Sequence, residues 1–127
     1  MSTVPTFERS FAMQTDGLLL RIFIGESDRR GDGGELLYKM IVNKAREAGL
    51  KGATVLRGSM GFGANSVLHT AKVLEMSSDL PIVVEIVDER AKIEGFLPFL
   101  EGTVSDGMIT MEDVRIVAWK GRDSVTR

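Results

Sequence analysis

The segment from Arg57 to Gly63 carries residue types suited to holding a small ligand. It reads RGSMGFG and places glycine at Gly58, Gly61 and Gly63. A glycine has no Cβ, so its backbone N–H can approach a phosphate or a purine edge. The guanidinium of Arg57 could hold a phosphate or carboxylate through two hydrogen bonds, and the ring of Phe62 could stack on a base. A tight turn with Phe62 buried in a subunit contact explains the same residues, so both interpretations stay open.

Three further cations are candidates for contact with an anion. Lys120 and Arg122 follow the last predicted strand, where a frayed and solvated tail is the alternative. Lys92 lies near the start of the second predicted helix. A cation there opposes the helix dipole unless it faces an anion. Lys92 is kept as a possible phosphate contact, whereas for Lys120 and Arg122 that role is implied only by their resemblance to the basic C-terminal segment of a known family.

Catalytic and metal chemistry finds little support in the residue types. The chain has one histidine, His69, and no cysteine. A thiolate metal site, a cysteine nucleophile and a two-histidine mechanism are therefore excluded. A Ser-His-Asp arrangement lacks an evident group to orient His69. Glu85 interrupts an apolar strand and is expected to pair with Arg21 or Arg115 across a subunit contact. We predict no catalytic residue, no metal site and no required cofactor.

Composition indicates an ordinary globular domain. The chain has 127 residues, a net charge of −2, 43% hydrophobic residues and 27% charged residues. The balanced charge argues against a nucleic-acid partner. No apolar run reaches the roughly 18 residues of a membrane span, so no membrane insertion is expected. The absence of cysteine and of a signal-peptide pattern favours a cytoplasmic location.

Apolar spacing predicts two copies of a strand–helix–strand unit. Alternating or β-branched runs predict four strands, and a three-to-four-residue spacing predicts two helices. The predicted strands are Leu18–Ile24, Ala53–Arg57, Ile82–Val87, and Met108–Met111 with Val114–Trp119 around an acidic bulge or turn. The predicted helices are Glu35–Ala48, closed by Gly49, and a second one capped by Asp88 and bent or shortened by Pro98. Loops are expected at 25–34 and 58–80.

This order, βαββαβ, predicts an α+β ferredoxin-like fold in which both helices cover one face of a four-stranded antiparallel sheet. Residues 17–121 form this domain, with a flexible extension over 1–16, or alternatively a subunit-packing arm, and a tail over 122–127. The second sheet face would carry Leu19, Phe23, Val83 and Val87. Another copy of the chain is expected to cover this apolar surface.

Several segments resemble the PII signal-transduction superfamily. They are Glu47–Val55 (EAGLKGATV), Gly61–Gly63 (GFG) and Leu80–Asp88 (LPIVVEIVD). The chain more closely resembles the PII-like family called domain of unknown function 190. That resemblance extends to Leu20–Glu26 (LRIFIGE), Arg57–Gly63 and Asp113–Trp119 (DVRIVAW), and spans roughly residues 18–121.

The resemblance implies a homotrimer with ligand sites in clefts between subunits. It also implies an adenine nucleotide as effector and a loop, here 58–80, that contacts a membrane ion transporter or a regulatory protein. Arg57, Gly58, Gly61, Phe62, Gly63 and Lys120 are the ligand-binding residues that this reading selects. A trimeric interaction module without a ligand, or a small hydrolase or isomerase on the same fold, remains an alternative.

Overall fold

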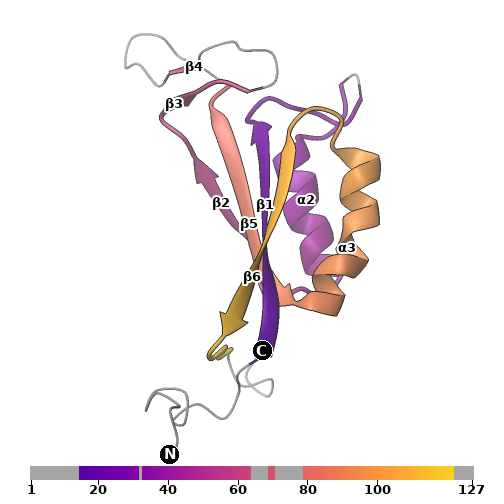
Figure 1. The fold of residues 1–127 in the computed structure, drawn as a ribbon. Helices are drawn as coiled ribbons and strands as arrows, with labels where there is room; N and C mark the ends of the chain where they lie inside the picture. Colours follow the sequence, from indigo (N-terminus) through magenta and orange to yellow (C-terminus); the bar gives the residue numbers. More distant parts are fainter. Residues whose placement is uncertain (1–14, 32, 64–68, 71–78, 122–127) are drawn as a thin grey trace, which may run out of the picture.

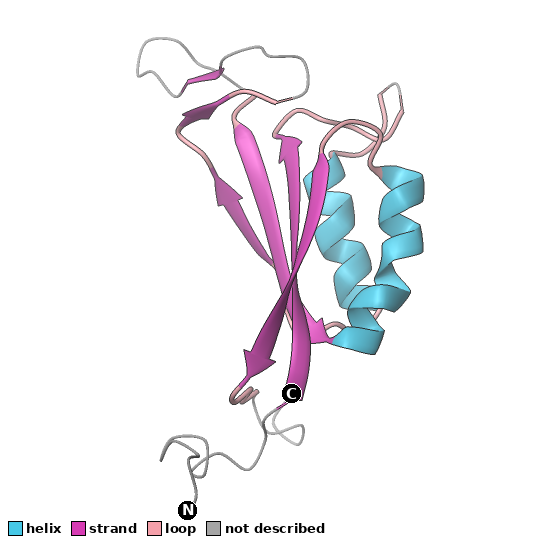
Figure 2. Cartoon of the chain, viewed as in Figure 1, coloured by secondary structure: helices cyan, strands magenta, loops and turns pink. Residues whose placement is uncertain are grey.

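Strand β1 (Thr15–Gly25) lies inside a four-stranded antiparallel sheet whose order is β2-β5-β1-β6. Its neighbours are β5 (Pro81–Glu89) and β6 (Met108–Ile116), and the short β2 (Thr54–Arg57) forms the edge beside β5. Helices α2 (Leu37–Glu47) and α3 (Arg90–Thr103) lie side by side on one face of the sheet (Figures 1 and 2). The predicted ferredoxin-like fold is confirmed. The computed structural model describes residues 15–31, 33–63, 69–70 and 79–121.

Most of the predicted extension, 1–14, and the tail 122–127 fall outside the described residues, whereas Thr15 and Asp16 already pair in β1. Neither helix in the described part is long and apolar enough to cross a membrane.

The core forms where the alternating strands meet the helices. In β1 the side chains of Leu20 and Ile22 are fully buried, as the alternation predicts. They pack in one cluster with alternate residues of β5 and with one stripe of each helix. The cluster consists of Leu18, Leu20, Ile22, Ile24, Leu37, Ile41, Ala45, Ile82, Val84, Ile86, Ile93, Phe96 and Leu100.

The end of α2 follows its sequence signal. Gly49 has a φ of 77°, a left-handed conformation that glycine adopts without steric cost. Its N–H donates to the carbonyl of Arg46, and the Leu50 N–H donates to the carbonyl of Ala45, both at 3.1 Å. This pair of bonds is a Schellman motif and stops the helix where the chain must turn toward β2.

The predicted break in the last strand is absent, and the second helix is not shortened at Pro98. Strand β6 runs without a bulge through Glu112 and Asp113, because the two carboxylates point to opposite faces and each finds an arginine: Arg21 for Glu112 and Arg90 for Asp113. Helix α3 continues through Pro98, which is exposed. The carbonyl that loses its helical donor there can be hydrated instead.

The face of the sheet opposite the helices is open. It carries Leu19 and Phe23 of β1, and Phe23 is 37% exposed. Val83 and Val87 of β5 lie directly across from them in the register. In the middle of this face the Arg21 Nε donates to Glu85 Oε2 at 2.9 Å. Arg21 is thus the partner predicted for Glu85, and it comes from the same chain.

Residues 58–80 are not one irregular loop. The described part contains β3 (Met60–Gly61) and β4 (His69–Thr70), which pair as a small antiparallel sheet. Pairing supplies partners for backbone groups that would otherwise depend on water. Residues 64–68 and 71–78 lie outside the described residues.

Asp88 is the buried charged residue in the core of the described chain, and it fastens the end of β5. Its carboxylate accepts the Glu89 N–H at 2.6 Å, the Lys51 N–H at 2.8 Å and the Lys51 ammonium at 3.3 Å. Asp88 was predicted to be the N-cap of α3, but Glu89 occupies that position, and its side chain makes no capping hydrogen bond. Burial raises the pKa of Asp88, but the bonds from Glu89 and Lys51 outweigh burial, so the pKa falls below its ordinary 3.8.

Asp88→Asn should lower the free energy of unfolding by about 1.5–3 kcal/mol near neutral pH, because charge-assisted bonds to a buried group are lost. Since the folded pKa is depressed, this stabilisation is present above the unfolded-state pKa and is lost as pH falls through the folded one. Urea unfolding across pH should show the difference from wild type shrinking below about pH 4. Glu101→Gln, an exposed acid on α3, is the control. A difference that stays constant on acidification would contradict this account.

Candidate functional site

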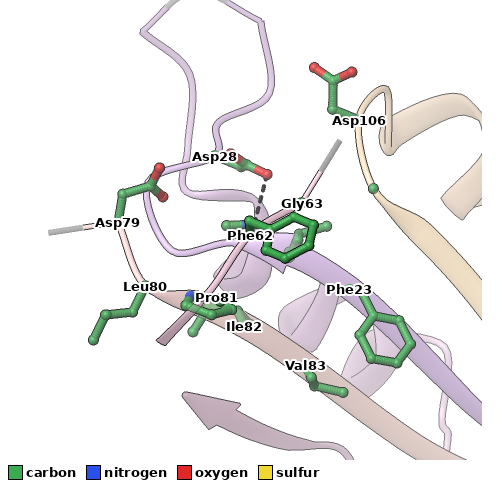
Figure 3. A pocket seen from close by; sticks show the side chains of 14 residues that line it. Phe23, Asp28, Phe62, Gly63, Asp79, Leu80, Pro81, Ile82, Val83 and Asp106 are labelled. Carbon is green, nitrogen blue, oxygen red and sulfur yellow. Dashed lines mark hydrogen bonds between the residues drawn. The ribbon is translucent and has the colours of Figure 1, made fainter. Parts of the chain in front are cut away.

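Four stretches of the chain meet at one end of the sheet. They are the end of β1 with the turn after it, the residues at and after β3, the start of β5 with the residues before it, and the turn between α3 and β6. Together they enclose a pocket of about 410 Å³ (Figure 3). The described residues that line it are Phe23, Ile24, Gly25, Asp28, Gly61, Phe62, Gly63, Asp79, Leu80, Pro81, Ile82, Val83, Asp106 and Gly107.

The pocket has apolar walls and an acidic rim. Phe23 and Val83 lie beside each other on paired strands, and Figure 3 shows them at the end of the pocket opposite the aspartates. The Phe62 side chain is 70% exposed. A planar group could therefore lie against an aromatic ring without any side chain having to move out of a packed core.

Backbone-to-carboxylate bonds shape the rim. Asp28 Oδ2 accepts the Gly25 N–H at 2.9 Å, and Asp79 Oδ1 accepts the Ser27 N–H at 3.0 Å. A Cβ on Gly25 would lie 2.8 Å from Asp79 Oδ1 and 3.0 Å from Asp28 Oδ1. A side chain at this position would therefore displace the two carboxylates from the strand end. Asp106 makes no hydrogen bond or ion pair with the rest of the described chain.

The two ends of the 58–80 segment lie next to the turn that follows β1. The Glu26 N–H donates to the Leu80 carbonyl at 2.8 Å, and the Gly58 N–H donates to the Pro81 carbonyl at 2.8 Å. The Arg57 guanidinium pairs with Glu26 at 2.5 Å. Both ends of the segment are therefore held against the pocket wall.

The predicted ligand residues divide into three groups. Gly61, Phe62 and Gly63 line the pocket. Gly58 lies beside it, since a Cβ there would be 3.1 Å from Pro81 Cγ, whereas Arg57 is outside the lining and already paired.

The predicted cations lie elsewhere. Lys120 is exposed and follows β6, whose other end adjoins the pocket, and Lys92 is exposed in the first turn of α3. Neither lines the pocket. Arg122 lies outside the described residues.

Sequence reasoning missed the acidic rim and Gly107. Asp28, Asp79 and Asp106 come from three separate turns, and nothing in their spacing indicates that they share a pocket. Gly107 could have been found, because an Asp-Gly pair between a helix and a strand is a turn signal. Its φ is 142°, and a Cβ there would lie 2.4 Å from the Phe23 carbonyl oxygen.

A second hollow, of about 450 Å³, lies toward the other end of β6 and is lined by Lys51, Val87 and residues 114–119. The lysine in this hollow is already paired. Its Nζ is 3.3 Å from Asp88, 3.6 Å from Glu89 and 5.4 Å from the centroid of the Trp119 ring. Within the described ranges no three His, Asp or Glu side chains lie close enough to hold a metal ion.

The arrangement of helices and strands is that of PII-like proteins. Two solved structures of CPII, a nitrogen regulatory PII-like protein from Thiomonas intermedia K12, share it. One, bound to ADP, AMP and bicarbonate, has a TM-score of 0.57 at 17% identity and covers 84% of this chain and 92% of that one. The other, bound to ADP and bicarbonate, has a TM-score of 0.52 at 19% identity, with 84% and 93% covered.

Sequence comparison assigns the family. The model of the DUF190 family, described as uncharacterized ACR, matches residues 17–116, and the chain belongs to this family. A UPF0166 protein of Aquifex aeolicus (strain VF5) is 41% identical over 99 residues, 78% of this chain and 91% of that protein. UPF0166 protein MJ1524 of Methanocaldococcus jannaschii is 32% identical over 99 residues, 77% and 89% of the two chains. The family predicted from the sequence is confirmed.

Gly107→Ala should lower the free energy of unfolding by about 1–3 kcal/mol, because the position has a positive φ and no room for a methyl group. Gly95→Ala is the matched control: it lies inside α3 with open space around it, so it should instead raise stability by about 0.5–1 kcal/mol. Urea unfolding measures both. Shifts of the same sign and size would mean that the α3–β6 turn does not need a glycine.

Proposed function

We propose that this chain is a PII-like regulatory protein that binds an adenine nucleotide in the pocket at the end of β1 and signals through the 58–80 segment. The observation that carries the proposal is that Gly61, Phe62 and Gly63 line the pocket while belonging to that segment. The volume, about 410 Å³, is within the range of small-molecule sites. A ligand there would touch the segment directly.

Two features support an adenine nucleotide as ligand. Exposed aromatic side chains, Phe62 and Phe23, offer faces for a purine. CPII, which shares the fold, is described as bound to ADP and AMP. Since a shared fold does not decide function, the pocket and its aromatic lining carry more weight than the likeness.

A homotrimer would complete the site. The open face of the sheet carries apolar side chains whose exposure to water is unfavourable. Packing against a second copy of the chain would bury them. Lys120 follows the end of β6 remote from the pocket, so it can serve a pocket only if it reaches one in a neighbouring copy. We assign to it the role of offsetting phosphate charge across the subunit boundary.

Signalling requires only that the ligand favour one arrangement of the 58–80 segment over another. The bonds from Glu26 to Leu80 and from Gly58 to Pro81 connect the pocket wall with both ends of this segment. The proposed partner is a membrane ion transporter or a regulatory protein. The role that we propose for this chain is therefore regulatory and not catalytic.

Val87→Glu should break the assembly, because it places a charge on the open face, where Val87 is 39% exposed. Val55→Glu is the matched control, since Val55 is 37% exposed but lies across from Val84 on the helix side. Light scattering at micromolar concentration should give about three chain masses for wild type and control and a smaller mass for Val87→Glu. A folded wild-type monomer would refute the trimer.

Phe62→Ala should weaken adenine-nucleotide binding by about 1–3 kcal/mol, the usual value of one base–aromatic stack. Met60→Ala is the control, because Met60 is 58% exposed two residues away and does not line the pocket. Arg57→Ala, in the same series, tests whether that paired guanidinium contributes. Calorimetric titration with AMP, ADP, ATP and cyclic AMP gives the affinities. If wild type binds none of them, the nucleotide proposal fails and the ligand-free interaction module takes its place.

A further inference from the structure

We infer that the pocket selects nucleotides with few phosphates: it accepts the base and ribose, and discriminates against di- and triphosphates. The inference rests on the proposed function and adds a ligand class to it. It is based on the acidic residues that line the pocket and on how few cations could neutralise them.

The charged residues among the described pocket lining are all acidic. They are Asp28, Asp79 and Asp106, and Figure 3 shows their side chains along one end of the pocket. Asp28 and Asp79 are fixed by bonds to the Gly25 and Ser27 N–H groups. Their positions therefore belong to the folded turn. A polyphosphate chain beside them would meet three negative charges at close range.

None of the described residues that line the pocket is a cation, and two cations outside the lining are already paired. Arg57, the nearest predicted candidate, is paired with Glu26 at 2.5 Å. Lys51, in the hollow at the other end of the sheet, is held by Asp88 and Glu89. Lys120 of a neighbouring copy, proposed above, adds about one positive charge. AMP brings about two negative charges and ATP without magnesium about four, so Lys120 comes closer to balancing AMP than ATP.

The walls, in contrast, suit the nucleoside end. Phe23, Phe62 and Pro81 offer apolar faces for a purine ring. A carboxylate is an acceptor only, and it pairs with donors such as ribose hydroxyls or the exocyclic amine of adenine. Asp106 is exposed and has no partner in the described part of the chain, so its oxygens are available to such donors.

The size of the effect follows from Coulomb interactions in water. Two extra negative charges at roughly 10 Å from three carboxylates should weaken ATP about tenfold relative to AMP at low ionic strength, and by less than about twofold in 0.5 M salt. Removing one carboxylate should reduce the tenfold gap to about fivefold, and reversing its charge to about twofold.

The test is calorimetric titration of the full chain with adenosine, AMP, ADP and ATP, with a chelator to remove magnesium, at low and high salt. The proteins are wild type, Asp106→Asn, Asp106→Lys and the control Glu47→Gln. Glu47 is an exposed acid at the end of α2, so its loss changes the net charge by the same amount as Asp106→Asn. We expect wild type and control to bind ATP about tenfold more weakly than AMP, and both Asp106 variants to narrow that gap.

Tighter binding of ATP than of AMP by wild type at low salt would overturn the inference and leave the proposed function standing. A gap that neither Asp106→Lys nor salt alters would overturn it as well, because the discrimination would then be steric. Absence of binding by all four ligands would refute the proposed function and this inference together.

Discussion

The structure depends on the one-sided burial of β1. This strand has partners on both edges, and one of its faces is packed under both helices, while the other carries Leu19, Arg21 and Phe23 into the open. A shift of register by one residue would exchange the two faces. The placement of the helices, the apolar open face and the pocket at the end of the strand all follow from that alternation.

Hydrogen bonds join the pocket wall to both ends of the 58–80 segment. Glu26, Ser27 and Asp28 follow β1 directly, and each bonds either to the strand end or to the residues that lead into β5. Paired charges of this kind, such as Glu26 with Arg57, are weak where water reaches them. The bonds donated by the Glu26, Ser27 and Gly58 N–H groups therefore hold the two ends of the segment more firmly than this ion pair does.

The features that the sequence predicts are those determined by residues close together in the chain. Alternation along β1 and β5, helical spacing in α2 and the Gly49 stop act within a few residues, and all were predicted. Gly61, Phe62 and Gly63 could be chosen as candidates because they are contiguous. The alternative of a tight turn with Phe62 buried is not what the described chain shows, since Gly61 lies in β3 and Phe62 is exposed. The rim of Asp28, Asp79 and Asp106 was not predicted, since three turns meet only after folding. The continuous β6 was missed because its two acids are satisfied by arginines from distant elements, Arg21 and Arg90.

The pairing of β1 with β6 also governs the order of events during folding. Thr15 lies opposite Ile116, and Phe23 lies opposite Met108, so this ladder joins strands separated by most of the chain. Contacts between residues so far apart close slowly, because chain entropy must be lost before they form. On the ribosome, β1 emerges early yet lacks its last neighbour until residues 108–116 have been synthesised. Until then, the edge of β1 that pairs with β6 carries unpaired backbone N–H and C=O groups, which other chains can pair with.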